Sequence, residues 1–392
     1  MKKQTLTIDS ELIFELIEVA VNILLTKNKG RIMAKIDAFF KLTYEQKASY
    51  LYLSSGSQPM LKIKDAVERV KYDVLKESFL RDLLYEILPG QKLKRFEETG
   101  SVRIVYEVPD VGRYRGFIYT TAHGISSSFK AIPLSPLSAE ASGLPSAITE
   151  LTKLQNGLVI LAGSKDSGKT ATIATMIDTI NRTRYSHIVT LENQIEYIYE
   201  NKRCLIDQLE TDRDFNFTNH TLKQISGRDA DIIYLSEMND PSVIKSAFEA
   251  VVSGRLVLTT MNTRSSKKTI ERITSRYPNG SVYQIHNDLA SSLKAVISQE
   301  SFTRADMNAK CIAFEILICT PAVRALIREN KLHSLAAMLQ VGKKFGMQPM
   351  DASIKNLFEK GWISAEDAYM KANDKNLFRQ YLLKPPADFT MV

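Results

Sequence analysis

The sequence predicts an α/β protein with two domains, and three observations lead to this prediction. Its 392 residues exceed the length of one ordinary domain. The first half alternates short strand patterns with turns, whereas the second half alternates strand patterns with helical ones. An apolar run, 158–162, leads into a glycine-bounded loop, 163–170, and then into a segment with helical periodicity. We therefore expect a small α+β domain followed by an α/β domain on a doubly wound parallel sheet.

The composition is that of a globular protein in a reducing compartment. Hydrophobic residues make up 44% of the chain, which is enough apolar material for a sizeable core. The net charge of +8 comes from basic residues dispersed among acids, so we interpret it as a generally basic surface and expect no nucleic-acid partner. The three cysteines form no C-x-x-C pair, which argues against a structural zinc site.

The first 45 residues have a helical pattern and form a predicted N-terminal extension, 1–45. Within it, 12–25 is the most apolar stretch, but it carries Glu15 and Glu18 and is too short to cross a bilayer. The acids also argue against a signal peptide. We interpret 10–25 as an amphipathic helix that packs on the body of the protein or on a partner.

The next segment, 46–132, is predicted to form the α+β domain around a largely antiparallel sheet. Alternating apolar and polar residues predict its strands, and clusters of Gly, Pro, Asp and Ser predict its turns. A helical pattern over 76–87 stops at Pro89 and Gly90. Three prolines within 133–148 then indicate a linker. The predicted strands are 50–53, 60–64, 101–108, 113–119 and 126–132.

The segment 149–300 is predicted to hold the parallel sheet. Four short apolar runs, typical of buried parallel strands, lie between helical patterns. From Ile270 onward the pattern is helical almost to the end, so we expect 301–392 to be a helical region. The four predicted strands are 158–162, 187–192, 232–236 and 256–261.

The loop 163–170 has the spacing of a phosphate-binding loop. Its N–H groups can turn inward around phosphate oxygens, and the following helix adds about half a positive charge at its N-terminus. We expect Lys169 to reach the β- and γ-phosphates and the Thr170 hydroxyl to bind Mg²⁺. An ordinary strand–turn–helix corner with a solvated lysine is the alternative. The residues predicted to surround the phosphates are Gly163, Ser164, Lys165, Asp166, Ser167, Gly168, Lys169, Thr170 and Ala171.

Two other predicted strands lead into acids. The carboxyl ends of parallel strands meet at one edge of a sheet, so these acids are expected near the phosphate loop. Glu237, after 232–236, is the candidate general base, and it can also hold Mg²⁺. Glu192, at the end of 187–192, is a candidate for positioning the metal or the water. A surface acid at a strand end is common, and this alternative stays open.

These motifs, in this order, resemble the type IV pilus retraction ATPases, the PilT/PilU branch of the type II/IV secretion ATPase superfamily. The resemblance extends from about Ala48 to Ala372. Many extension and secretion members carry a four-cysteine metal module, and its absence here favours the retraction branch. The matching motifs are 50–64, 108–115, 131–133, 143–145, 163–170, 187–196, 228–238, 313–330 and 346–351.

The resemblance implies a PAS-like N-terminal domain, a RecA-like P-loop ATPase domain and a hexameric ring of identical subunits that binds ATP between domains. It implies a cytoplasmic motor for pilus retraction and twitching motility. Such a motor is peripheral to the inner membrane through a platform protein, and a homologous pilus ATPase is a further implied partner. Arg113 and Arg115 match the family arginines that approach the phosphates from the first domain. Without the resemblance, two arginines that alternate on a strand indicate a solvated face.

The sequence departs from the family pattern mainly at the active site. Arg255 and Asn262 occupy the positions of two histidines, and we expect both to contact the nucleotide. Asn262 can donate a hydrogen bond but cannot take up a proton, so hydrolysis is expected to be weakened or lost. Two functions remain: an ATP-hydrolysing motor, or an ATP-binding paralogue that regulates or supports an active pilus ATPase. The other departures are Asn193 and Gln194 in the acidic box, Ser236, Asn239, Lys130 and the phosphate-loop residues 164–166.

Overall fold

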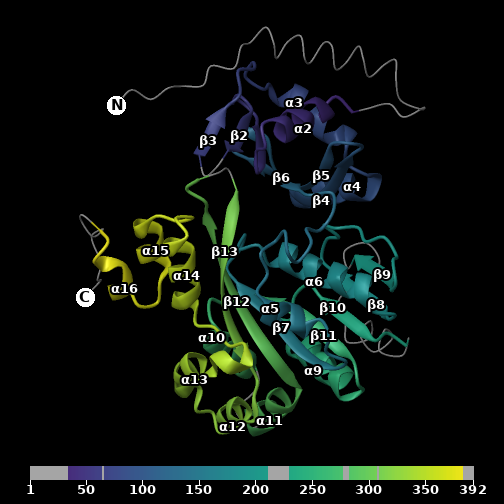
Figure 1. The fold of residues 1–392 in the computed structure, drawn as a ribbon. Helices are drawn as coiled ribbons and strands as arrows, with labels where there is room; N and C mark the ends of the chain where they lie inside the picture. Colours follow the sequence, from purple (N-terminus) through teal and green to yellow (C-terminus); the bar gives the residue numbers. More distant parts are fainter. Residues whose placement is uncertain (1–33, 64–65, 211–228, 277–281, 307–308, 383–392) are drawn as a thin grey trace. The chain divides into compact units, whose positions relative to one another are not determined.

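The computed structural model describes residues 34–63, 66–210, 229–276, 282–306 and 309–382. Contacts within the chain divide it into two compact units, Met1–Leu134 and Ser135–Val392 (Figure 1). The predicted helix 10–25 lies outside the described residues. Across the described ranges, no helix is both long enough and apolar enough to span a membrane.

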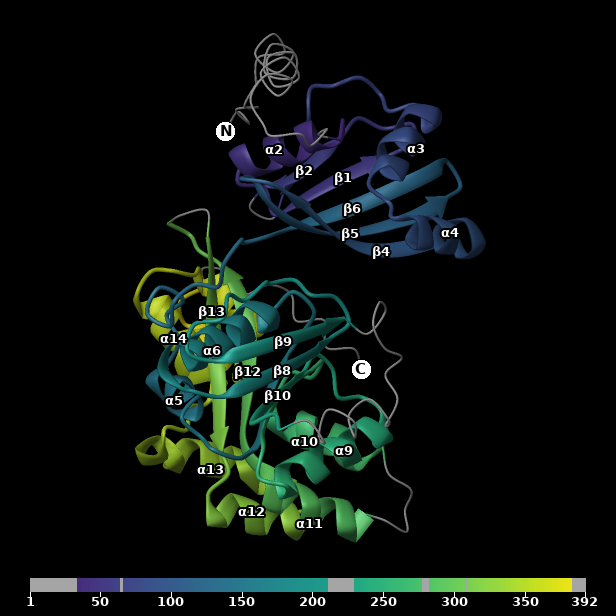
Figure 2. The ribbon, with the colours of Figure 1, turned by 90° about the vertical axis from the view of Figure 1, so that its right-hand side faces the viewer.

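The first unit is built on a six-stranded antiparallel sheet with the order β3-β2-β1-β6-β5-β4. Figure 2 labels the strands from β2 to β4 in this order. All five predicted strands are present, and the predicted helix over 76–87 is confirmed as α3. A further helix, α4, begins directly at Gly90. The elements are α2 (Asp37–Glu45), β1 (Tyr50–Ser54), β2 (Met60–Ile63), β3 (Ala66–Arg69), α3 (Glu77–Glu86), α4 (Gly90–Thr99), β4 (Ser101–Val108), β5 (Gly112–Thr121) and β6 (Gly124–Ile132).

Helix α2 belongs to the core of this unit. Its Phe39 and Phe40 are buried together with Ile36, just before the helix. The ring of Phe40 stacks on Tyr114 with 4.3 Å between centroids, and the Tyr114 hydroxyl donates to the Phe40 carbonyl at 2.7 Å. The expectation that 1–45 is a separate extension is therefore wrong for its last part, because the apolar face of α2 packs on the sheet.

The second unit contains a seven-stranded sheet with the order β13-β12-β7-β11-β10-β8-β9. All neighbouring strands are parallel except β12 and β13, which are antiparallel. The four predicted parallel strands are confirmed as β7, β8, β10 and β11. The strands are β7 (Gly157–Gly163), β8 (His187–Glu192), β9 (Leu205–Glu210), β10 (Ile232–Leu235), β11 (Leu256–Met261), β12 (Leu293–Thr303) and β13 (Lys310–Ile318).

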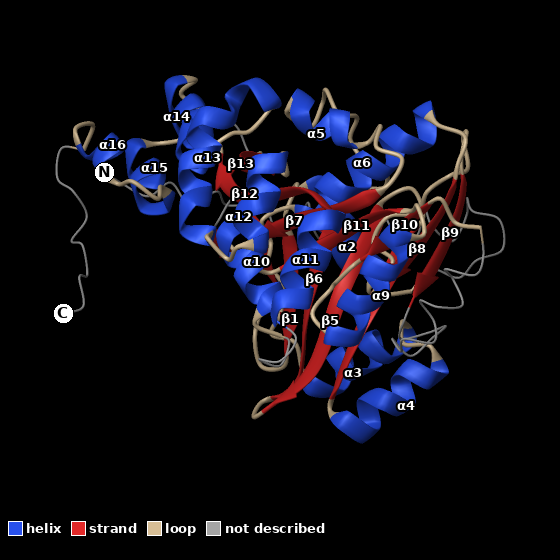
Figure 3. Ribbon diagram, turned by 90° about the horizontal axis from the view of Figure 1, so that it is seen from below, coloured by secondary structure: helices blue, strands red, loops and turns tan. Residues whose placement is uncertain are grey.

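Helices cover both faces of this sheet. Leu158 and Ile160 of β7 belong to one hydrophobic core, and the alternating Val159 and Leu161 belong to the other. Figure 3 shows α5 and α6 on one side of the strands and α9, α10 and α11 on the other. The helices are α5 (Ser146–Leu151), α6 (Lys169–Thr183), α9 (Pro241–Val252), α10 (Ser266–Thr274), α11 (Val282–Ser292), α12 (Pro321–Arg328), α13 (Leu335–Val341), α14 (Met350–Glu359), α15 (Ala365–Lys371) and α16 (Asn376–Arg379), with short 3₁₀ turns at Leu332–Ser334 and Gly342–Phe345.

The prediction of a helical pattern from Ile270 almost to the end is wrong for 293–318. This stretch forms β12 and β13, so the sheet continues past residue 300 into the region expected to be helical. Most residues of both strands are buried, including consecutive ones. A strand buried on both faces lacks the alternation that separates it from a buried helix. The helical region begins at Pro321, and β12 lies directly beside β7 (Figure 1).

Candidate active site at the carboxyl edge of the parallel sheet

The phosphate loop connects the carboxyl end of β7 to the N-terminus of α6. Two of its residues have left-handed backbone conformations, Asp166 with φ 63° and Gly168 with φ 92°. A Cβ atom on Gly163 would lie 2.3 Å from the Ser167 hydroxyl oxygen and 2.7 Å from the Gln299 carbonyl oxygen. The loop is therefore a tight turn that requires glycine where it leaves the strand.

Lys169 lies across this loop. Its Nζ donates to the carbonyl oxygens of Gly163 at 2.8 Å and of Ser164 at 2.7 Å. Thr170, the next residue of α6, is partly exposed, and Lys165 is exposed in the loop. The ammonium group and the N-terminus of α6 thus supply positive charge at the same place, which suits an anionic ligand.

Glu237 and Asn262 lie side by side after neighbouring strands. Asn262 Nδ2 donates to Glu237 Oε1 at 3.4 Å, and Asn239 Nδ2 donates to the same oxygen. The Thr260 hydroxyl donates to the Ser236 carbonyl at 2.6 Å, which ties the ends of β11 and β10 together. These contacts hold the carboxylate at a defined position.

The order β7-β11-β10 places these residues at the same edge as the phosphate loop. Asn262 follows β11, the strand between β7 and β10. Neighbouring strands lie about 4.8 Å apart, so β10 is about 10 Å from β7. The structure therefore brings together the phosphate loop, Asn262 and Glu237. The order of the strands along the chain does not by itself give this order in the sheet.

Glu192 ends β8, on the far side of β10, and only 4% of it is exposed. Its Oε1 accepts from the Thr190 hydroxyl at 2.8 Å and from Gln208 Nε2 at 3.3 Å. The pKa of Glu192 is raised to about 7, mainly by burial; the two hydrogen bonds act to lower it, and the charges of Glu196 and Glu210 act to raise it. This carboxyl can therefore exchange a proton near neutral pH.

Arg255 lies at the amino ends of the parallel strands, opposite the end that carries the phosphate loop. It precedes β11, and its carbonyl accepts from the N–H of Gly157 at the start of β7. The phosphate loop follows the other end of β7, about 20 Å away at the rise of a β-strand. The structure thus does not bring Arg255 to the phosphate loop of its own subunit.

Arg113 and Arg115 lie on β5 of the first unit, on the face opposite the buried Tyr114. Arg115 pairs across the sheet with Lys130 of β6, so the three cationic positions share one face. Arg113 Nε lies 3.4 Å from Glu107 Oε2, and the Arg113 side chain is 11% exposed.

Sequence reasoning missed two groups of residues beside the site. Gln208 lies on β9 and contacts Glu192, and 299–301 at the end of β12 contact the phosphate loop. Both strands were absent from the prediction. The apolar run 295–297 was the available signal for β12, since it resembles the four runs that were assigned correctly.

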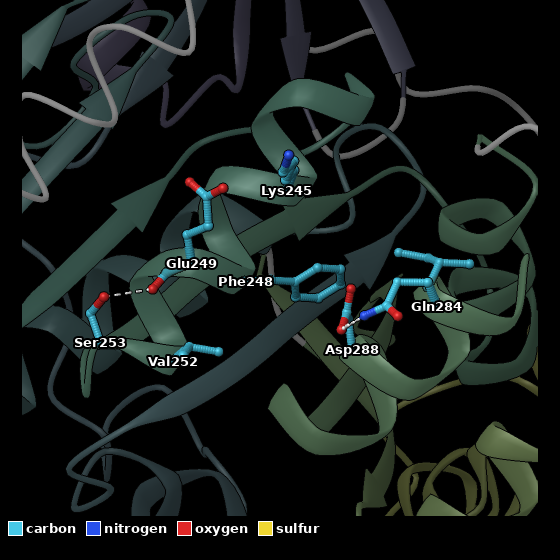
Figure 4. A pocket seen from close by; sticks show the side chains of 8 residues that line it. Lys245, Phe248, Glu249, Val252, Ser253, Gln284 and Asp288 are labelled. Carbon is cyan, nitrogen blue, oxygen red and sulfur yellow. Dashed lines mark hydrogen bonds between the residues drawn. The ribbon is translucent and has the colours of Figure 1, made fainter. Parts of the chain in front are cut away.

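A separate hollow lies between α9 and α11 and has a volume of about 510 Å³. Figure 4 shows the Phe248 ring facing this hollow. Beside it, Gln284 Nε2 donates a hydrogen bond to Asp288 Oδ1 at 2.7 Å. It contains none of the predicted site residues. Its lining is Lys245, Phe248, Glu249, Val252, Ser253, Gln284, Ile285 and Asp288.

Comparison with known proteins identifies the family. The profile of the family described as type II/IV secretion system protein matches residues 130–353. The type IV pilus retraction ATPase PilT of Pseudomonas aeruginosa is 36% identical over 328 residues, which cover 84% of this chain and 95% of that protein. A twitching motility protein of Neisseria gonorrhoeae is 33% identical over 81% of this chain and 84% of its own length.

A solved structure agrees with these relatives. The crystal structure of the pilus retraction motor PilT with bound ADP superposes with a TM-score of 0.77 at 30% identity, covering 86% of this chain and 97% of that one. Its similarity extends over both units, which supports the predicted order of a small N-terminal domain and a RecA-like domain. The chain therefore belongs to the type II/IV secretion system protein family, among the relatives of the type IV pilus retraction ATPases.

Proposed function

We propose that this protein is an ATP-binding and ATP-hydrolysing ring motor for type IV pilus retraction, the basis of twitching motility, or for related filament or secretion traffic. The observation that carries the proposal is the glycine-bounded loop with Lys169 at the same sheet edge as Glu237 and Asn262. The relatives named as retraction ATPases, and the ADP-bound motor with the same fold, support ATP as the nucleotide.

Each site residue has a separate task in this proposal. The main-chain N–H groups of 163–171 and the Lys169 ammonium bind the phosphates. Glu237 orients the attacking water and accepts its proton. Among the described residues, both amide donors bind Glu237 Oε1, which leaves Oε2 for that water. Asn262, between the loop and Glu237, donates to the γ-phosphate.

The residues also fit a magnesium ion that accompanies the nucleotide. Within the described ranges, no cluster of three or more His, Cys, Asp and Glu side chains could hold a metal alone. Mg²⁺ suits a site with few protein ligands, because it is usually held by one or two of them together with phosphate oxygens and waters. Thr170 would be its protein ligand, with Glu192 or Glu237 in reach through water. The ion would neutralise charge on the phosphates.

The proposal includes assembly into a hexameric ring in the cytoplasm. Arg113 and Arg115 would reach the phosphates from the first unit, and domain motion would pass to an inner-membrane platform protein. A guanidinium supplied by a moving domain couples the chemical step to that motion.

One observation favours the alternative of a catalytically weak paralogue that supports an active pilus ATPase. Both Asn239 and Asn262 donate hydrogen bonds to Glu237. These bonds engage one oxygen of the candidate base with amide donors. Neither amide can relay a proton, so the arrangement suits binding better than rapid hydrolysis.

Measurements of Mg·ATP binding and steady-state turnover test the proposal, with Lys169→Ala as the variant. Lys153→Ala, at an exposed lysine paired with Glu150, is the matched control. We expect Lys169→Ala to abolish both binding and turnover, because it removes the ammonium that faces the phosphates, and the control to retain both. Binding without turnover in the parent protein would support the regulatory paralogue. A folded parent protein that binds no nucleotide would overturn both functions.

A further inference from the structure

The carboxyl end of β12 contacts the phosphate loop through three successive residues. Gln299 Nε2 donates to the Ser167 carbonyl at 2.6 Å. The Ser164 hydroxyl donates to Glu300 Oε2 at 3.3 Å, and the Ser301 hydroxyl donates to the Asp166 carbonyl at 3.4 Å. One strand thus supports the loop along most of its length.

Gln299 makes the closest of these contacts. It is 2% exposed and lies against both glycines of the loop. A Cβ atom on Gly163 would lie 2.7 Å from the Gln299 carbonyl oxygen, and one on Gly168 would lie 3.2 Å from Gln299 Nε2. The strand and the loop are therefore packed at van der Waals distance with no room for a larger residue.

The hydrogen bond from Gln299 sets the orientation of one peptide group. A trans peptide is planar, so its C=O and N–H point in opposite directions. Because the Ser167 carbonyl points at Gln299, the N–H of Gly168 points away from β12. Glycine tolerates both orientations of the preceding peptide, so the loop sequence alone leaves this peptide free to rotate.

We propose that Gln299 is a positioning residue for the phosphate loop. Its side chain holds the 167–168 peptide so that the Gly168 N–H faces the β-phosphate. This inference rests on the proposed nucleotide binding. Inward-pointing amides are what makes such a loop an anion site. Gln299 thus preorganises a main-chain donor that the ligand would otherwise have to orient.

A second observation separates this role from a purely structural one. In the described part of the chain, Gln299 Oε1 is buried and has no hydrogen-bond partner. A buried acceptor without a donor reduces stability, so an apolar side chain of the same size would suit a purely structural position better. The Gln299 amide is therefore expected to orient the loop peptide while lowering the stability of the folded protein.

The test uses Gln299→Met, which keeps the side-chain volume and removes the donor. Gln348→Met is the control, since Gln348 Nε2 donates to the Phe314 carbonyl at 2.9 Å away from the loop. We expect Gln299→Met to keep the Tm of the nucleotide-free protein within a few degrees or to raise it, and to weaken Mg·ADP binding about tenfold, the loss of one good hydrogen bond. Affinity for AMP, which has no β-phosphate, should not change. The control should bind ADP normally.

Unchanged ADP affinity in the folded variant would overturn the inference, as would equal losses for ADP and AMP. If Gln299→Met does not fold, Gln299→Asn replaces it, because it keeps the amide but withdraws it by one methylene. ADP affinity equal to that of the parent protein in the asparagine variant would also overturn it. Failure of the parent protein to bind ADP would instead refute the proposed function, so the two outcomes are distinguishable.

Discussion

The two sides of the candidate site are built from different chemical groups. The phosphate side, between β7 and α6, consists mainly of main-chain amides and one ammonium group. The acidic side, after β8, β10 and β11, consists of the side chains of Glu192, Glu237 and Asn262. Every non-proline residue carries a backbone N–H, so the first side tolerates substitutions that would change the chemistry of the second.

The departures from the family pattern that the resemblance implies lie on both sides of the site. In the loop they are Ser164, Lys165 and Asp166, and the loop still turns tightly into α6. On the acidic side they are Asn239 and Asn262, and both directly contact Glu237. We therefore expect nucleotide binding and hydrolysis to be separable in this protein.

Among variants that leave the phosphate loop intact, the largest effect is expected for Arg113→Ala. If Arg113 stabilises charge on the transferred phosphoryl group, turnover should fall by about 10³–10⁵, while Mg·ADP affinity changes little. Steady-state assays and calorimetry on the same preparations would measure both quantities.

Glu107→Gln is the control for this variant, because it removes the acid 3.4 Å from Arg113 and keeps the guanidinium. It should retain most of the turnover. Turnover that survives Arg113→Ala would show that the Arg113 guanidinium is not needed for the reaction, and equal losses in the two variants would assign the effect to their ion pair.

A smaller effect is expected for Glu237→Gln. Loss of a general base typically slows a reaction by about 10²–10⁴, whereas the glutamine can still accept the bond from Asn262. ADP affinity should therefore be retained while turnover falls by this factor. Glu249→Gln, at an acid lining the separate hollow on α9, is the control. Loss of binding together with turnover would contradict the separation of the two sides.

The smallest effect concerns stability at Glu192. The pKa of Glu192 is raised to about 7 by burial, so the folded state favours the protonated carboxyl. The stability from this preference is fully present below the ordinary pKa of 4.5 and is lost as the pH rises through about 7. Glu192→Gln should therefore be more stable than the parent protein at pH 8, by about 2–3 kcal/mol, and similar to it near pH 4.5.

Urea unfolding at several pH values would measure this difference. A stability difference that does not grow with pH would show that Glu192 is better solvated than its burial indicates. A loss of stability at pH 8 would show that its charged form is the one the fold favours.

The elements predicted correctly are those whose pattern is local. The strand, loop and helix around Gly163 are contiguous, so the single stretch 157–183 contains the whole signal. The strand ends at Glu192 and Glu237 were also predictable in outline, because the carboxyl ends of parallel strands share an edge. Strands β9 and β12 were missed, and Gln208 and Gln299 with them.

By itself, the sequence determined the phosphate loop, the four central parallel strands and the acids that follow two of them, since each depends on neighbours along the chain. Only the tertiary structure placed Gln299 against Ser167, 132 residues earlier in the chain, and Arg255 at the edge away from the loop. Strand order and burial decided both. Residues distant in the chain leave no short-range pattern, because the contacts that select their positions exist only after the sheet has assembled.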